Sequence, residues 1–315
     1  MEFVDTHAHL ASADFREDLA TVLGQAREAG VGAVIAVTED LTEAERALEL
    51  ATQHPGLRPA AGIHPDRVVG LSSPAPLLAE FAALAELARL RRGELVALGE
   101  VGLDFWKAAG HEERLLQETL LTSFVALARE LDLPLSVHSR AAGRATIELL
   151  RRSGAERVVL HAFDGKRSTA DPGLEAGYFF SVPPSLVRSP QKQKLFKRFP
   201  LERLLLETDS PVLGATPGAR NEPACVVRAA EELARLQGVS LAEVAEVTTR
   251  NAQMLFRLPG GLSGSDPAGL SGSDPGGLSG SDPGSPTATP ADRDRDRGPG
   301  SLPLPATTTG PRPPT

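Results

Sequence analysis

The stretch VDTHAHL at residues 4–10 begins as an apolar strand pattern and ends in two histidines. Side chains of a strand alternate between its two faces, so His7 and His9 are expected on one face, with Thr6 and Ala8 on the other. No G-x-G-x-x-G follows this first strand, which disfavours a dinucleotide-binding sheet. Two imidazoles at one strand end can bind a metal if the fold brings further ligands to them.

Short apolar segments and amphipathic segments alternate through the first 258 residues. The expected strands are 3–8, 31–37, 57–63, 95–101, 134–138, 157–163, 178–182 and 203–207. The expected helices are 16–29, 42–53, 76–92, 111–131, 142–153, 169–176, 188–198, 223–237 and 240–256. Strands separated by helices indicate a parallel sheet. Eight such units, in a length near the roughly 250 residues typical of the fold, predict an α/β protein with a (β/α)8 TIM barrel.

The composition changes sharply at Pro259. From Pro259 to the end there are no aromatic residues, no Val and no Ile, and five Leu stand against twelve Pro. The segment GLSGSDP occurs three times, starting at Gly261, Gly269 and Gly277. One leucine per repeat of eight residues cannot offset the entropy of ordering the chain. We therefore expect a barrel domain at 1–258 and a disordered low-complexity tail at 259–315.

The bulk composition is that of an ordinary globular protein, with 41% hydrophobic and 23% charged residues. No apolar stretch approaches the roughly 20 residues that cross a bilayer, and the N-terminus has neither a basic leader nor an apolar signal core. The single cysteine, Cys225, fits a reducing compartment. We expect an intracellular protein of the nucleus or cytoplasm, with no membrane association and no evident obligate protein partner.

The net charge of −8 disfavours a surface that coats nucleic acid in general. It leaves room for an enzyme that acts on nucleic acid, because bound metal ions carry positive charge to the phosphate.

Histidines and carboxylates recur at the expected strand ends, where TIM barrels carry their functional residues. Five of the seven histidines lie there. In chain order the candidates are His7, His9, His64, Glu100, His138, His161 and Asp209. Each alone has a structural explanation: a single histidine is more often hydrogen-bonded than metal-bound, Glu100 could pair with Arg140, and Asp209 could cap a helix. Their shared position on one rim favours a ligand cluster.

Imidazole and carboxylate ligands suit divalent cations such as Mg, Mn, Co or Zn. Six candidate ligands without a thiolate favour two cations over one, and the sequence leaves their identity open. Glu100 is expected to bridge them, because a carboxylate has two oxygens and an imidazole offers one nitrogen. Two metals can stabilise the attacking and leaving oxygens of a phosphodiester displacement, and Asp209 is the candidate to orient or deprotonate the attacking water.

Several longer motifs contain these residues. They are DTHAHL at 5–10, GIHP at 62–65, GEVGLDF at 99–105, VHSR at 137–140, LHAFDG at 160–165, ETDSP at 207–211, RNEP at 220–223 and TTRNAQMLF at 248–256. In order and spacing they resemble the TatD family of metal-dependent deoxyribonucleases, barrels of the amidohydrolase superfamily. The resemblance covers essentially 1–258. LHAFDG, with GYFFSVPPS and SPQKQKL, is most similar to the third vertebrate paralogue of the family, since bacterial members usually have an HCFSG-like stretch.

The resemblance implies one metal on His7, His9, Glu100 and Asp209, and a second on Glu100, His138 and His161. It also implies that His64 and Arg140 contact the substrate phosphate. The implied activity is hydrolysis of DNA, at single strands or 3′ ends as an exonuclease, with cleavage at abasic sites as a further activity.

Two alternatives stay open. The first is an amide or ester hydrolase on the same barrel, although many such relatives bridge their metals through a carboxylated lysine where this chain has Glu100. The second is a non-catalytic binding module, against which all six expected ligands are retained.

Two further residues have roles that the sequence leaves open. Trp106 follows the Glu100 strand and either packs within the protein or stacks on a base. Asn221, in RNEP, is expected to cap the final helix pair, with Pro223 in its first turn.

Overall fold

Eight parallel strands form the centre of the computed structural model, which describes residues 1–260. The strands are β1 (Phe3–Ala8), β2 (Val31–Ala36), β3 (Leu57–Ala61), β4 (Ala97–Gly102), β5 (Leu135–His138), β6 (Val158–Leu160), β7 (Phe179–Val182) and β8 (Leu204–Leu206). Each strand pairs in parallel with the next one along the chain. The expected barrel is confirmed.

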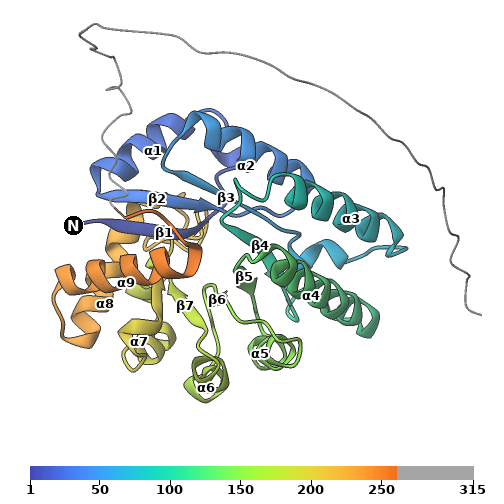
Figure 1. Ribbon diagram of the computed structural model, residues 1–315. Helices are drawn as coiled ribbons and strands as arrows, with labels where there is room; N and C mark the ends of the chain where they lie inside the picture. The colour runs from blue at the N-terminus through green and yellow to red at the C-terminus, as the bar shows by residue number, and fades with distance from the viewer. Residues whose placement is uncertain (261–315) are drawn as a thin grey trace, which may run out of the picture. The chain divides into compact units, whose positions relative to one another are not determined.

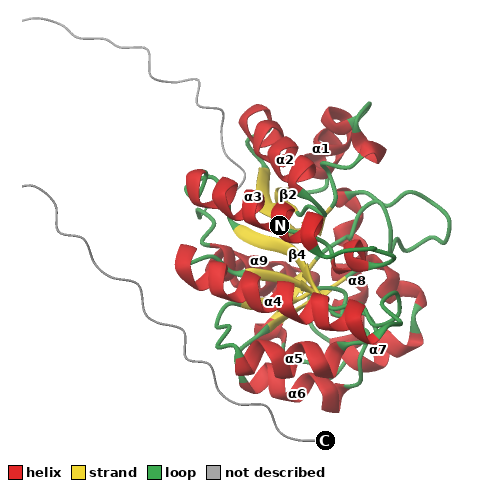
Figure 2. Cartoon of the chain, turned by 90° about the vertical axis from the view of Figure 1, so that its right-hand side faces the viewer, coloured by secondary structure: helices red, strands yellow, loops and turns green. Residues whose placement is uncertain are grey.

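Helices surround the strands, as Figures 1 and 2 show from two directions. They are α1 (Leu19–Glu28), α2 (Leu41–Gln53), α3 (Ala75–Leu90), α4 (His111–Leu131), α5 (Gly143–Arg152), α6 (Arg167–Glu175), α7 (Pro190–Phe196), α8 (Val226–Gln237) and α9 (Leu241–Phe256). Each corresponds to a segment predicted as helical. The alternation of strand and helix therefore runs through the whole barrel.

Two strands, β3 and β6, end at least two residues earlier than predicted, because side chains take over their hydrogen bonds. After β3, the backbone N–H of Gly62 donates to Oγ1 of Thr38 at 3.1 Å, where a strand would pair with its neighbour. After β6, the N–H of Ala162 donates to Glu207 at 2.8 Å, and Ala162 adopts a φ of 44°. The segments that follow β3 and β6 both leave the sheet at the rim where the candidate residues lie.

Hydrogen bonds between the first and last strands, and between the residues that directly follow them, close the barrel. The N–H of His9 donates to the carbonyl of Ser210 at 2.8 Å, and the N–H of Asp209 donates to the carbonyl of His7 at 2.8 Å. Oγ1 of Thr6 donates to the carbonyl of Leu206 at 2.9 Å. This seam places Asp209 directly beside the histidines of β1.

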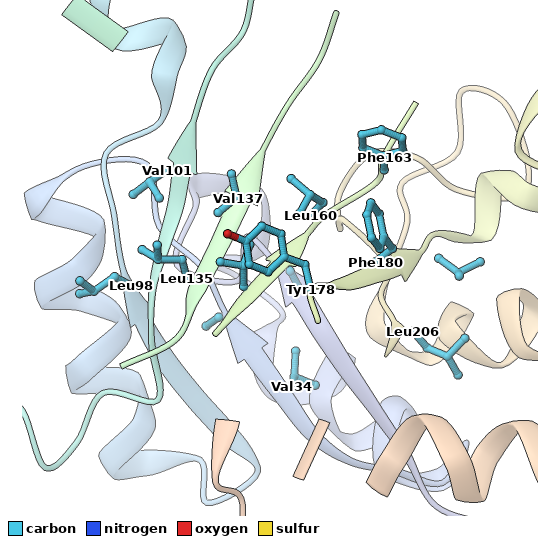
Figure 3. Packing of buried hydrophobic residues seen from close by; sticks show 14 of the residues in the cluster. Val34, Leu98, Val101, Leu135, Val137, Leu160, Phe163, Tyr178, Phe180 and Leu206 are labelled. Carbon is cyan, nitrogen blue, oxygen red and sulfur yellow. The ribbon is translucent and has the colours of Figure 1, made fainter. Parts of the chain in front are cut away.

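Two apolar layers hold the barrel together. The inner layer consists of strand side chains and the last turn of α9, with Val4, Ile35, Val159, Phe179, Leu205, Leu255 and Phe256 among its members. The outer layer lies between strands and helices, and Figure 3 shows Leu98, Leu135 and Leu160 in it. Phe163 and Phe180 also belong to it, with ring centroids 5.2 Å apart. The apolar layers leave the polar side chains to the carboxyl ends of the strands.

The predicted cap at Asn221 is wrong. Its Nδ2 donates to the carbonyls of Thr208 and Val212, at 2.7 and 2.8 Å, and Glu222 occupies the N-cap position of the short 3-10 turn Pro223–Cys225, without a hydrogen bond from its side chain. The long connection after β8 buries carbonyls that need a donor, and the buried amide of Asn221 supplies it. Pro223 does lie in a first turn, as expected.

The predicted tail at 259–315, with its GLSGSDP repeats, lies outside the described residues except for Pro259 and Gly260, which are exposed. Within residues 1–260, no helix is long and apolar enough to cross a membrane.

Candidate metal centre

Glu100, buried at the end of β4, lies at the centre of the histidine cluster. Its Oε1 lies 2.7 Å from Nδ1 of His138 and 2.8 Å from Nε2 of His161. Its Oε2 lies 3.4 Å from Nε2 of His7 and 3.3 Å from Nε2 of His9. The two oxygens thus face different pairs of imidazoles, as a bridging carboxylate requires.

Asp209 extends the side of the cluster that β1 forms. Its Oδ1 lies 3.3 Å from Nε2 of His9 and 3.7 Å from Nε2 of His7. The residue has a φ of 57°, in the left-handed region that aspartate tolerates better than most residues. A backbone held in this region at a strand end is typical of functional sites.

The chemistry of the cluster fits divalent cations. Glu100 and Asp209 are buried, and within residues 1–260 their ion pairs are with histidines alone, with no Lys or Arg. Nε2 of His7 and Nδ1 of His9 are buried without a hydrogen-bond partner. Buried carboxylates that lack a cationic partner are costly, so bound cations would stabilise this arrangement.

Three groups of donor atoms have the spacing of a metal site, with all atoms of a group within 4.8 Å of one another. They are His7, His161 and Asp209; His7, His9 and Glu100; and His64, Glu100 and His138. The fold therefore brings together all six residues expected as ligands, and His64 with them.

Polar side chains behind the imidazoles hold the rings of His7 and His138 in place. Nδ1 of His7 lies 3.0 Å from Oγ of Ser136, whereas Nδ1 of His161 lies 3.6 Å from Oε2 of Glu207, too far for a hydrogen bond. Nε2 of His138 lies 3.1 Å from Oδ2 of Asp104. Such partners fix the orientation of metal-binding histidines.

The sequence did not reveal Ser136, Asp104 or Glu207 as part of the site. Asp104 and Glu207 do stand in the GEVGLDF and ETDSP motifs, next to the residues that were identified.

Electrostatics shift the pKa values of the clustered groups in different directions. Burial lowers the pKa of His7, and the neighbouring His161 lowers it further. Burial opposes ionisation of Glu100, but the imidazoles of His161, His64 and His7 hold its pKa well below its usual range. In the chain without metal, contacts with Asp209 and Glu100 overcome burial and raise the pKa of His9. A cation would displace that proton on binding.

His64 lies within the cluster. Its Nδ1 accepts a hydrogen bond from the N–H of Asp66 at 3.2 Å and lies 2.7 Å from the Asp66 carboxylate. Its Nε2 is therefore turned inward, 3.6 Å from Oε1 of Glu100. From there it can face either a bound phosphate or a cation.

Arg140 does not pair with Glu100, so that structural explanation for Glu100 is wrong. The Arg140 guanidinium binds Asp104 instead, with Nε and a terminal nitrogen 3.0 and 2.8 Å from Oδ2. It lies on the rim outside the histidine cluster, over the exposed ring of Trp106. Because its ring is exposed, Trp106 does not pack inside the protein.

Comparison with known protein families and curated proteins finds matches over the whole barrel. The family model described as TatD related DNase matches residues 4–257. The human protein "Deoxyribonuclease TATDN3" is 46% identical over 259 residues, which cover 80% of this chain and 94% of the human protein. "3'-5' ssDNA/RNA exonuclease TatD" of Erwinia tasmaniensis is 33% identical over 267 residues, with 81% of this chain and 99% of that protein covered.

Among solved structures, that of YJJV, a TATD homolog from Escherichia coli, superimposes with a TM-score of 0.75 at 30% identity. The match covers 82% of this chain and 98% of the bacterial one. The higher identity to the vertebrate protein than to the bacterial ones confirms the branch that the LHAFDG motif indicated.

Proposed function

The chain belongs to the family of TatD-related DNases, and from that membership we propose that it is a deoxyribonuclease with two divalent cations in its active site. The observation that carries this proposal is the position of Glu100, whose two carboxylate oxygens face two different sets of imidazoles. One set would bind each cation, with Glu100 as the shared ligand.

The proposed ligands divide along the barrel rim. His7, His9 and Asp209, with Oε2 of Glu100, would hold one cation, and His138 and His161, with Oε1 of Glu100, would hold the other. Mg, Mn, Co and Zn all suit such a set of nitrogen and oxygen donors. Divalent cations bound there would lower the pKa of water toward about 7 and stabilise charge on the phosphate oxygens.

The residues of the chain have distinct roles in the proposed reaction. The Asp209 carboxylate orients the attacking water and accepts its proton. This role requires the carboxylate to lie within hydrogen-bond reach of that water. The inward-facing Nε2 of His64 donates to a phosphate oxygen, and its Nδ1 contact with Asp66 keeps it in that orientation. Arg140 contacts the phosphate backbone of the DNA further along the rim.

The proposed substrate is DNA, taken as a single strand or at a 3′ end, with abasic sites as a further target. The names of the human deoxyribonuclease and the Erwinia exonuclease support a nucleic-acid substrate. We propose that the barrel at 1–258 carries the whole activity and that 259–315 is dispensable for it. The single cysteine fits action in the nucleus or cytoplasm, where thiols stay reduced.

An amide or ester hydrolase on this barrel has less support. This chain has a carboxylate, Glu100 in β4, where many such enzymes have a carboxylated lysine. The one buried lysine within residues 1–260, Lys192, lies on α7 and donates to the carbonyl of Ala162 at 3.0 Å. It is thus engaged elsewhere.

A metal-reconstitution assay tests the proposal. Protein stripped of metal is resupplied with Mg, Mn, Co or Zn, and is assayed on labelled single-stranded, duplex and abasic DNA beside simple amide and ester substrates. We expect DNA cleavage that depends on the cation and is lost in His138→Ala. The matched control is His111→Ala, a histidine at the start of α4 outside the cluster, which should keep full activity. Amide or ester hydrolysis without DNA cleavage would overturn the proposal.

A further inference from the structure

Trp106 presents an aromatic ring to solvent beside the candidate metal centre. Its side chain follows β4 and is 66% exposed. Of the Phe, Tyr and Trp rings in residues 1–260, it is the only one in an exposed position. Single exposed apolar side chains are common on protein surfaces, but this ring lies next to the candidate metal centre, where a ligand could cover it.

The ring is held in a defined position. The guanidinium of Arg140 lies over it, 4.4 Å from the ring centroid, and Nζ of Lys107 lies 5.6 Å from the centroid. The backbone N–H groups of Trp106 and Lys107 both donate to Oδ1 of Asp104, at 3.0 and 2.9 Å. Because Asp104 also binds Arg140, one buried carboxylate fixes both the loop and the cation that covers the ring.

The same carboxylate connects the ring to the metal centre. Oδ2 of Asp104 lies 3.1 Å from Nε2 of His138, whose Nδ1 lies 2.7 Å from Glu100. Only one carboxylate and one imidazole therefore separate Arg140 from the proposed bridging ligand. A nucleic-acid strand whose phosphate is held at the centre would pass within reach of the ring.

We propose that Trp106, backed by Arg140, is a stacking platform for an unpaired nucleobase next to the scissile phosphodiester. This inference rests on the proposed nuclease function and adds a determinant of substrate specificity. Stacking on an aromatic ring accepts any base, and the two nearby cations, Arg140 and Lys107, suit the phosphates that flank it. A base inside a duplex has its faces covered by its neighbours, so the platform selects single strands and frayed ends.

Intrinsic fluorescence gives a direct test, because Trp106 is the only tryptophan in the chain. Stacking of a base on the indole should quench its emission. An oligothymidylate is titrated into metal-loaded Asp209→Asn protein, in which cleavage is slowed, and binding is followed in parallel by anisotropy of a label on the DNA. We expect quenching that follows binding of the single strand, and none with a blunt duplex. Binding of the single strand without quenching would overturn the proposal.

Kinetics provide the second test. Trp106→Ala should raise KM for single-stranded DNA by about 5- to 100-fold, the range that loss of one stacked base gives. Activity on methyl p-nitrophenyl phosphate, which has no nucleobase, should stay unchanged, and Trp106→Phe should recover most of the affinity for DNA. The control is Leu90→Ala, which removes another exposed apolar side chain at the end of α3.

The outcomes separate this inference from the function on which it rests. Unchanged KM in Trp106→Ala, with normal cleavage of DNA by the wild type, would refute the platform and leave the nuclease intact. Equal losses on DNA and on the small diester would mean that Trp106 acts only through the Asp104 loop, which also refutes the platform. Absence of DNA cleavage by the wild type with any of the cations would instead refute the proposed nuclease.

Discussion

Nδ1 of His138 lies 2.7 Å from the Glu100 carboxylate while Nε2 of the same ring lies 3.1 Å from Asp104. The imidazole is thus fixed between two carboxylates, one at the centre of the ligand cluster and one behind it. Such an arrangement sets both the direction in which the ring points and the nitrogen that carries its proton. The site therefore depends on residues that touch no substrate.

Asp104→Asn should expose this dependence. The amide keeps the size of the side chain but removes the charge that orients His138 and anchors Arg140. We expect metal affinity, measured by competition with a chelator, to fall by about 10- to 100-fold. Asp171→Asn, which removes a half-buried carboxylate paired with Arg167 on α6, is the control. Unchanged affinity in Asp104→Asn would mean that the ring needs no such support.

Glu100→Gln tests the shared ligand. If the carboxylate bridges two cations, an amide with one oxygen cannot replace it, and metal content should drop from two equivalents toward one or none. Elemental analysis of the purified variant measures this directly, with circular dichroism to verify the fold. Two full equivalents would show that Glu100 has a structural role only.

Asp209→Asn should leave the fold intact and slow turnover on DNA by at least about 10²-fold, the scale of lost general acid–base catalysis. Its Oδ1 contacts with His9 and His7 could persist with the amide oxygen, so the variant isolates the loss of the base from a loss of shape. Single-turnover rates are the appropriate measurement. Near-normal rates would remove Asp209 from the role of base.

His64→Ala separates phosphate contact from metal binding. Six other residues are proposed as the ligands of two cations, so metal stoichiometry should be unchanged while cleavage of DNA weakens. The loss should be smaller for a small activated phosphodiester, which has no neighbouring phosphate. His54→Ala, at the end of α2, is the matched control. A drop in metal content would instead make His64 a ligand, a role that its 3.6 Å distance from Glu100 also allows.

Removal of metal should lower the melting temperature. A ligand at 100 times its dissociation constant stabilises the folded state by about 2.7 kcal/mol, which for a barrel of this size corresponds to about 5–10 °C. Differential scanning calorimetry with and without a chelator measures the shift. Glu100→Gln should show a much smaller one, and equal shifts in both proteins would place the stabilising metal elsewhere.

Local patterns were enough to predict the barrel and to bring the candidate ligands together. Strand ends such as Glu100 and His161 were identified because parallel strands of a barrel all deliver their last residues to one rim. Asp104 and Glu207 were not identified, because their role depends on which carboxylate lies next to which imidazole in the folded chain, and local sequence patterns do not give that pairing. The same holds for Asn221, whose partners are carbonyls of a loop rather than the end of a helix.

The seam between β1 and β8 has a consequence for how the protein comes into being. The hydrogen bond from Asp209 to the carbonyl of His7 joins the two ends of the barrel and two proposed ligands of the same centre. A chain still being synthesised has exposed His7 and His9 long before Asp209 leaves the ribosome, so it cannot complete the centre. A nascent chain, or a fragment that ends before β8, therefore lacks one of the proposed ligands and is expected to be inactive.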